Sequence, residues 1–203
     1  MISVIIPYDR DRGFLAQCER SIKMQSYSDF EIIKVNRPYP VAKNFNIGLK
    51  LAKGEFCKFV TEDDWLPVDG LKHLAEGIED HPWICANAEQ HEALGMYVYK
   101  PFYPAVISFE KNLIRNHIHG GTTLYRTEIL KEIGGMDEDL WTAEEYEMHL
   151  RLMSKGYMPG YIDKVVYCHR IWSGQKSKQL RKKRKDEREK EITRIQTLYL
   201  NEV

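Results

Sequence analysis

Residues 56–65 read Phe56-Cys57-Lys58-Phe59-Val60-Thr61-Glu62-Asp63-Asp64-Trp65, a mainly apolar stretch that leads into three consecutive carboxylates. Similar apolar runs occupy residues 3–6 and 30–35, and apolar residues at helical spacing lie within 14–25 and 41–53. Short apolar runs of this kind are typical of buried parallel strands. The order strand, helix, strand, helix, strand predicts right-handed crossovers and a parallel sheet. We therefore expect an α/β fold.

The carboxylates follow Val60, at the end of the third expected strand. Ligands of such sheets bind beyond the carboxyl ends of the strands. Adjacent carboxylates repel one another unless a cation lies among them, and Mg²⁺ or Mn²⁺ takes one or two carboxylates together with substrate phosphates. An alternative is structural, because Asp64 lies just before Pro67, which is typical of a helix start. This segment alone leaves both interpretations open.

The second half of the chain is less regular. The patterns favour helices at 71–79 and 127–133 and strands at 83–88, 96–99 and 165–167, whereas the pattern of 108–115 is ambiguous. A further helix is predicted from about residue 141 to 155, with Gly156 as its stop. Its first turn contains Glu144 and Glu145, where the helix dipole keeps a carboxylate ionised and available as a base. Acidic residues are also ordinary at a helix start, so this pair alone is weak evidence.

The C-terminal segment changes composition abruptly. Nine lysines and arginines lie between residues 176 and 190, and apolar residues then recur at helical spacing at Ile192, Ile195, Leu198 and Tyr199. The pattern predicts a terminal helix that is basic in its first half and docked or self-associating in its second. A solvated charged helix is the favoured interpretation of the basic block. Contact with a polyanion through 176–190 is the alternative.

Composition narrows the class of protein. The chain has 203 residues with 30 basic and 30 acidic side chains and 43% hydrophobic residues, which fits one domain with a short appendage and excludes general disorder. Four cysteines are widely spaced without a zinc-ligand rhythm, so we expect buried thiols in a reducing compartment. No apolar run approaches the roughly 20 residues that span a bilayer, and the N-terminus lacks signal-peptide features. We expect a cytoplasmic protein without a transmembrane segment.

An ordered set of motifs resembles a known family over roughly residues 1–177. The segments are 3–7 (SVIIP), 21–27 with 30–33, 42–48 with 52–55, Glu62-Asp63-Asp64-Trp65, 135–138, Glu144-Glu145-Tyr146, 150–151 and 156–157. Together they resemble the family 2 glycosyltransferases. The resemblance implies a GT-A fold, a Rossmann-like and mostly parallel sheet flanked by helices, here followed by a basic C-terminal helix. It divides residues 1–174 into a nucleotide-sugar half (1–66) and an acceptor half (67–174), with 175–203 as the appended helix.

The resemblance also implies roles for individual residues. Glu62 and Asp64 lie where the family binds Mn²⁺ or Mg²⁺ through its DXD motif, with Asp63 between them on the nucleotide-sugar side. His169 is a further metal-side candidate, with Trp172 as the competing residue at that position. Glu145 aligns with the family's general base and Glu144 is its neighbour. The expected reaction inverts the anomeric centre by direct displacement.

Donor and acceptor residues follow from the same resemblance. The nucleotide-sugar set, with a UDP-sugar favoured, is Pro7, Asp9, Arg10, Asn36, Lys43, Asn44 and Asp63. In this set Asn36 replaces a usual aspartate and Lys43 a common arginine, while Glu145 replaces an aspartate as the base. The acceptor side is expected to include Gly120, Gly121 and Trp141.

Three functional hypotheses are compatible with these residues. The first is a metal-dependent inverting glycosyltransferase that acts on the hydroxyl of a glycan. The second keeps the reaction but uses a polyanionic acceptor, such as hydroxymethylated DNA, held by the basic block. The third is a catalytically silent module that binds a sugar nucleotide. Self-association through the terminal helix is left open.

Overall fold

The computed structural model describes residues 1–92, 95–99, 107–175 and 184–200. Its N-terminal part confirms the predicted alternation of strands and helices. The elements are β1 (Ile2–Tyr8), α1 (Leu15–Lys23), β2 (Phe30–Asn36), α2 (Val41–Leu51) and β3 (Phe56–Phe59). Strand β1 pairs in parallel with both β2 and β3. The ends of β1, β2 and β3 therefore lie along one edge of the sheet, where the carboxylates of 62–64 emerge.

The second half completes a mixed sheet. Its elements are α3 (Gly70–Ile78), β4 (Trp83–Glu92), β5 (Gly95–Tyr99), α4 (Phe109–Ile114), the 3₁₀ turn η2 (Gly120–Thr122), β6 (Leu124–Arg126), α5 (Thr127–Glu132), α6 (Glu144–Ser154), β7 (Gly160–Arg170) and α8 (Lys185–Tyr199). The strand order is β2-β1-β3-β6-β4-β5, and β7 pairs with β4. Strand β6 is antiparallel to β3 and β4, whereas β7 is parallel to β4. The α/β class with a sheet flanked by helices is thus confirmed.

Two strands are longer than the sequence pattern indicated. The pattern ended the first middle strand before the polar pair His91-Glu92, but β4 continues through both residues, because β5 pairs with them. Strand β7 begins at Gly160 and continues to Arg170, well beyond the expected residues 165–167, because it pairs with β4 as far as His91. His169 therefore lies within a strand rather than in the loop that follows it.

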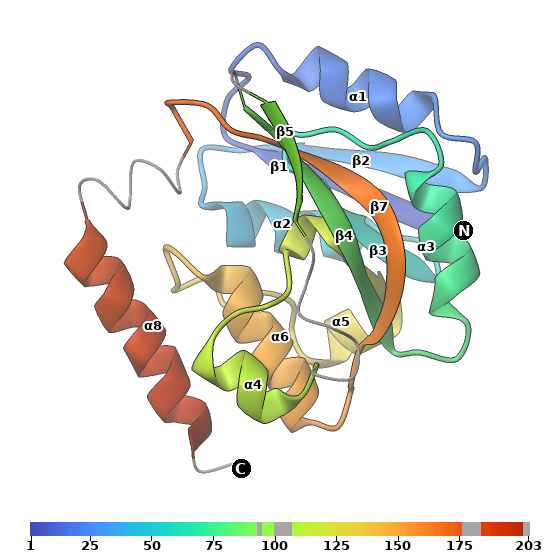
Figure 1. Ribbon diagram of the computed structural model, residues 1–203. Helices are drawn as coiled ribbons and strands as arrows, with labels where there is room; N and C mark the ends of the chain where they lie inside the picture. The colour runs from blue at the N-terminus through green and yellow to red at the C-terminus, as the bar shows by residue number, and fades with distance from the viewer. Residues whose placement is uncertain (93–94, 100–106, 176–183, 201–203) are drawn as a thin grey trace.

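Two hydrophobic cores cover the two faces of the sheet. One face packs Ile2, Val4 and Ile6 of β1 against α1 and α3. The other face packs the residues of β3 and β4 against α2, α4, α5 and α6. Figure 1 shows this arrangement of three layers, with α1 and α3 on one side of the strands and α2, α5 and α6 on the other. All four cysteines are buried free thiols, as expected.

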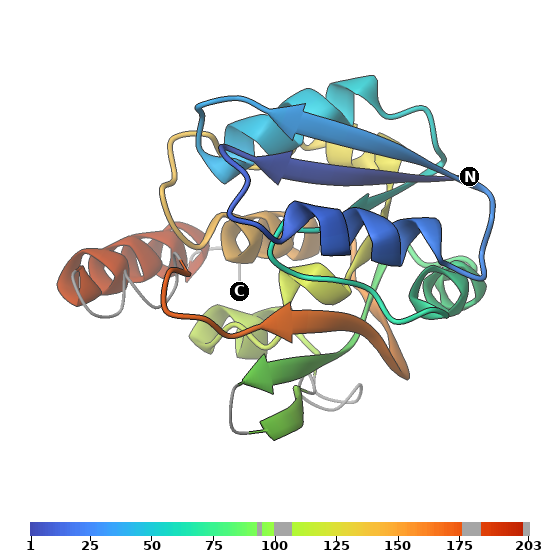
Figure 2. The same ribbon diagram turned by 90° about the horizontal axis from the view of Figure 1, so that it is seen from above.

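The last helix lies at the periphery of the molecule (Figure 2) and docks on its own domain. Ile195 and Tyr199 are 3% and 5% exposed, and both belong to the core beside α4 and α6. Leu198 is 65% exposed and points away from that core. At its start, Arg184 pairs with Glu187 and Lys185 with Glu189, as expected of a solvated charged surface. The rest of the basic block, 176–183, lies outside the described residues.

The part of the chain that the structure describes contains no helix long and apolar enough to cross a membrane.

Candidate active site

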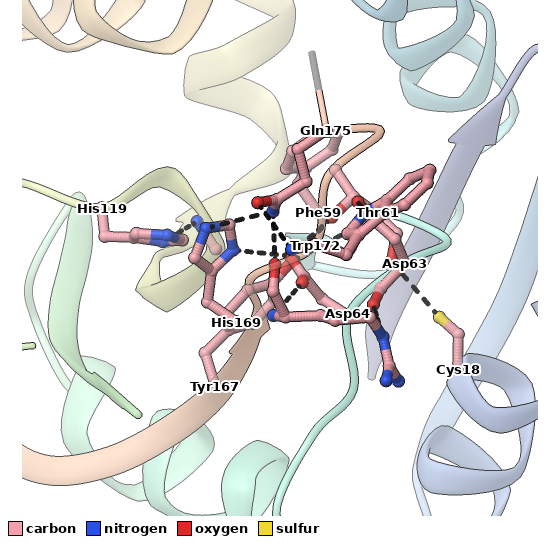
Figure 3. A network of polar contacts seen from close by, with 12 residues as sticks. Cys18, Phe59, Thr61, Asp63, Asp64, His119, Tyr167, His169, Trp172 and Gln175 are labelled. Carbon is pink, nitrogen blue, oxygen red and sulfur yellow. Dashed lines mark hydrogen bonds and ion pairs between the residues drawn. The ribbon is translucent and has the colours of Figure 1, made fainter. Parts of the chain in front are cut away.

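Asp64, which follows β3, is at the centre of a polar network with the C-terminal end of β7. Its carboxylate is 3% exposed. Oδ2 accepts hydrogen bonds from the hydroxyls of Tyr167 and Thr61, each at 2.7 Å, and Oδ1 accepts one from the backbone N–H of Arg170 at 2.7 Å. His169 Nδ1 lies 3.2 Å from Oδ2 (Figure 3). Burial alone would raise the pKa of Asp64, but the contact with His169 and the other hydrogen bonds outweigh it and lower the pKa.

The residues at and just after the end of β7 contact two different carboxylates. His169 contacts Asp64, while the Trp172 indole N–H donates to Asp63 Oδ2 at 2.9 Å. Burial favours neutral His169, yet the hydrogen bond and charge of Asp64 raise its pKa overall. Burial and the neighbouring charge of Asp64 raise the pKa of Asp63. The geometry thus puts His169, rather than Trp172, beside the carboxylate predicted as the main metal ligand.

Glu62 faces a different partner, the loop after β1. Arg12 makes a short ion pair with Glu62, and its other terminal nitrogen lies 2.7 Å from Asp9 Oδ1. Burial and the charge of Asp63 raise the pKa of Glu62 to about 7, against the effect of Arg12. Sequence analysis missed Arg12, because its partner is fifty residues away in the chain. Arg10 is exposed, and its backbone N–H donates to Asp9.

The three carboxylates therefore point to three different neighbours: Glu62 to Arg12, Asp63 to Trp172 and Asp64 to His169. Within the described residues, Glu62 does not join Asp64 and His169 in a cluster of ligand atoms within 4.8 Å. Asp64 and His169 alone offer one oxygen and one nitrogen side by side. This pair suits a divalent ion that completes its coordination with substrate phosphates.

The predicted nucleotide-side residues fall into two groups. Pro7 and Asn44 are buried and support the backbone: Asn44 Nδ2 donates to the carbonyls of Arg37 and Tyr8, at 2.9 and 3.2 Å. Asn36 is exposed at the end of β2, next to Tyr8 in the register. The Lys43 ammonium lies 4.5 Å from the centre of the Tyr39 ring. Asn36, which is exposed, and Lys43, which is half-buried, can therefore contact a ligand directly, whereas the buried Pro7 and Asn44 shape the loop around it.

Glu145, the candidate base, enters the site from the first turn of α6. Ala143 precedes this helix in the left-handed conformation, with φ 61°, and Glu144 beside it is buried. The Glu145 carboxyl group packs so closely on Gly120 that a Cβ there would lie 2.6 Å from Glu145 Cδ. A Cβ at Gly121 would lie 2.4 Å from the ring of Tyr167. The two glycines thus permit Glu145 and Tyr167 to approach the turn.

Trp141, predicted on the acceptor side, contacts the residue that precedes α8. It is half-buried, and the guanidinium of Arg184, just before α8, lies 5.3 Å from its ring centre.

Lys58 is a second residue that sequence analysis missed. It is fully buried on β3, where its ammonium donates to the carbonyl of Gly121 through a short contact and to that of Phe59 at 3.2 Å. Its Nζ lies 5.1 Å from the centre of the Tyr167 ring. Burial lowers the pKa of Lys58 to about 7, although Glu145 and Asp64 favour the charged form. In the sequence, a lysine within the otherwise apolar run 56–60 was the feature that could have indicated this residue.

Comparison with known proteins identifies similar chains, although no protein-family model matches this one. An uncharacterized glycosyltransferase of Haemophilus influenzae is 28% identical over 200 residues, which cover 83% of this chain and 68% of the relative. Glycosyltransferase GlyA of Streptococcus pneumoniae is 24% identical over 87% of this chain and 31% of the relative. The matched region therefore spans 68% of the first relative's length and 31% of the second's.

Solved structures share the fold. TarS of S. aureus in complex with UDP-GlcNAc superposes with a TM-score of 0.66 at 19% identity, over 86% of this chain and 59% of TarS. Mannosyltransferase PcManGT of Pyrobaculum calidifontis, in complex with GDP-Man and Mn²⁺, gives a TM-score of 0.60 at 17% identity, over 83% of this chain and 56% of that one. The expected GT-A architecture is thereby confirmed.

Proposed function

We propose that this chain, a glycosyltransferase of GT-A fold, moves a sugar from a nucleotide-sugar donor to an acceptor hydroxyl with the help of Mn²⁺ or Mg²⁺. The observation that carries the proposal is the contact between Asp64, which follows β3, and His169 near the end of β7, with the Glu145 carboxylate close enough to favour the charged forms of His169 and Lys58. In this proposal residues 1–66 bind the donor, 67–174 bind the acceptor, and 175–203 are an appended segment that contains α8.

The chain's own residues divide the work of the reaction. Asp64 and His169 would hold the divalent ion, with Glu62 and Asp63 adding negative charge around it. When bound, the ion neutralises the diphosphate leaving group. The Glu145 carboxylate accepts the proton of the attacking hydroxyl. From the resemblance to the family 2 glycosyltransferases we expect direct displacement by the attacking hydroxyl without a covalent sugar intermediate, and a single displacement inverts the anomeric centre.

The donor pocket is proposed at the edge formed by the ends of β1 and β2. Asn36 is exposed there and offers amide hydrogen-bonding groups to a nucleotide base. Arg12 and Lys43 bring positive charge to the same loops, where they would contact phosphates. TarS and PcManGT were solved with UDP-GlcNAc and GDP-Man respectively, so both nucleotides are rational probes. We favour UDP, and a glycan hydroxyl as acceptor.

The first test is a thermal-shift series with nucleoside diphosphates and nucleotide sugars, each with and without Mn²⁺. A ligand that binds only the native state raises the melting temperature. We expect one nucleotide to do so only with Mn²⁺, and Asp64→Asn to remove the effect. The exposed Asp80→Asn is the matched control and should behave like wild type. Absence of a shift with every nucleotide would contradict the donor site.

A second variant separates binding from chemistry. Glu145→Gln should still bind the nucleotide sugar with Mn²⁺, yet transfer or hydrolyse it about 100-fold or more slowly, because the general base is lost. Glu76→Gln, on the exposed side of α3, is the control for the substitution itself. Unchanged turnover in Glu145→Gln would remove Glu145 from the mechanism. Binding without turnover in wild type would instead favour the silent sugar-nucleotide module.

A further inference from the structure

Three side chains with different metal-binding atoms converge on β4 and β7, next to the candidate active site but separate from it. Glu89 Oε, a ring nitrogen of His91 and Cys168 Sγ all lie within 4.8 Å of one another. Among the residues that the structure describes, no other set of three His, Cys, Asp or Glu ligand atoms converges in this way. We propose that Glu89, His91 and Cys168 bind a zinc ion or a similar transition-metal ion.

Strand geometry explains why these residues meet. Glu89 and His91 are two positions apart on β4, so their side chains project from the same face. Cys168 is the partner of Glu89 in the parallel register with β7. The pairing of the two strands therefore brings the three residues together whatever rotamers their side chains adopt. His91 Nε2 already lies 3.2 Å from Glu89 Oε2.

The neighbourhood holds the site in place while leaving it open to an ion. The N–H of Cys168 donates to the carbonyl of Trp65 at 2.9 Å, and the N–H of Trp65 donates to the carbonyl of Cys168 at 3.2 Å. The Trp65 ring packs on the ring of His91 with 4.6 Å between centres. Cys168 is buried, whereas the side chains of Glu89 and His91 are 25% and 31% exposed. An ion can therefore reach the buried thiol from the side of Glu89 and His91.

The ligand types select the metal. Sulfur, imidazole nitrogen and carboxylate oxygen together suit tetrahedral Zn²⁺, with water as the fourth ligand, whereas Mg²⁺ and Mn²⁺ prefer oxygen-rich sites. Ligand atoms around one zinc ion are about 3.5 Å apart, as bond lengths of roughly 2.0–2.3 Å require, so small side-chain rotations complete the site. On binding, the Cys168 thiol loses its proton to solvent and the thiolate bonds to the metal.

This site and the candidate active site use alternate residues of the same two segments. On β7, Cys168 faces Glu89 and the next residue, His169, contacts Asp64. In the segment after β3, Asp64 contacts His169 and the next residue, Trp65, packs on His91. The two sites therefore share a backbone but no ligand. The zinc proposal does not depend on the proposed transferase function.

Cobalt replaces zinc in sites of this kind and reports its ligands by absorption. We expect the metal-free full-length protein to bind one equivalent of Co²⁺ with a sulfur-to-cobalt charge-transfer band, and Zn²⁺ to displace it. Excess Mn²⁺ should leave the band unchanged. Cys168→Ala should abolish the band and His91→Gln should weaken Co²⁺ binding at least tenfold. The control variant Cys85→Ala removes a buried thiol from β4, the strand that carries Glu89 and His91, and should leave the band intact.

Two outcomes would overturn the proposal: no thiolate band in the wild-type protein, or a band that survives in Cys168→Ala. Circular dichroism of each metal-free variant establishes that it folds. His91→Gln keeps the thiol and substitutes a half-exposed position, so it remains informative if Cys168→Ala is unstable. Because the readout is absorption rather than sugar transfer, failure of the zinc site leaves the transferase proposal untouched, and the reverse also holds.

Discussion

Tyr167 contacts two charged side chains, Lys58 and Asp64, from which it is more than a hundred residues away in the sequence. Its hydroxyl donates to Asp64, and its ring faces the ammonium of Lys58. Lys58 in turn holds the carbonyl of Gly121, the residue next to the glycine under Glu145. A buried ammonium costs free energy, which hydrogen bonds to two carbonyls offset only in part. We interpret Lys58 as a positioning residue for the turn that supports the base.

Lys58→Met tests this interpretation through the pH dependence of stability. The pKa of Lys58 falls from an ordinary 10.5 to about 7 in the native protein. Such a group destabilises the native state increasingly as the pH falls from about 10.5 to about 7. At pH values below about 7 the destabilisation stays at its full size. When the pH is lowered from 10 to 7, the free energy of unfolding of Lys58→Met should therefore rise relative to that of wild type by about 1–4 kcal/mol. Urea denaturation at both pH values measures it.

The exposed Lys72→Met is the matched control and should show no such pH dependence. Transfer activity gives a second readout, because Lys58→Met loosens the turn at Gly121 and should slow transfer even where it stabilises the fold. A pH-independent difference in stability would show that Lys58 is not titrated in the way proposed.

Gly120 has a steric role in the same turn. Its missing Cβ leaves room for the carboxyl group of Glu145, which would otherwise lie 2.6 Å away. Gly120→Ala should therefore destabilise the protein by about 1–3 kcal/mol and displace the base. In the double variant Gly120→Ala/Glu145→Ala the clash partner is gone, so most of the lost stability should return. A double-mutant cycle in urea measures this coupling, and additive effects would argue against the contact.

At the scale of elements, periodicity predicted the N-terminal half well. β1 to β3 and α1 to α2 lie where the apolar runs and helical spacing put them, because each buries one continuous face or stripe. Polar residues within two strands made the predicted strands too short. His91 and Glu92 belong to β4 and His169 belongs to β7, although polar residues of this kind normally indicate a loop. α4 is only six residues long, too short for a helical period to show.

The candidate site was predictable in its acidic residues but not in its connections. Glu62, Asp64 and Glu145 stand out in the sequence because carboxylates after a strand or at a helix start suggest chemistry. Arg12, Lys58 and Tyr167 do not, because each acts through a partner that only the fold brings near. For His169 and Trp172 the sequence likewise did not show the contacts: His169 contacts Asp64, whereas Trp172 contacts Asp63.

At the scale of the whole molecule, α8 packs against α4 and α6. The Tyr199 hydroxyl donates to Glu147 Oε1 of α6 at 2.6 Å. Gln196 donates to the carbonyls of Leu113 and Ile114 at the end of α4, at 2.8 and 3.0 Å. Because α6 begins with Glu144 and Glu145, the docking of α8 supports the helix that carries the proposed base, Glu145. The docked face is apolar, and the opposite face, which includes Leu198, is exposed.

Ile195→Ala should reveal whether this docking is intramolecular in solution. Ile195 is 3% exposed in the core beside α4 and α6, so its truncation should cost about 2–5 kcal/mol. Leu198→Ala, on the exposed face of the same helix, should change stability by less than about 0.5 kcal/mol. If α8 packs on its own domain, the urea midpoints of both variants and of wild type will not change with protein concentration. A midpoint that rises with concentration would mean that α8 packs on a second copy of the chain, since association stabilises the folded state by mass action.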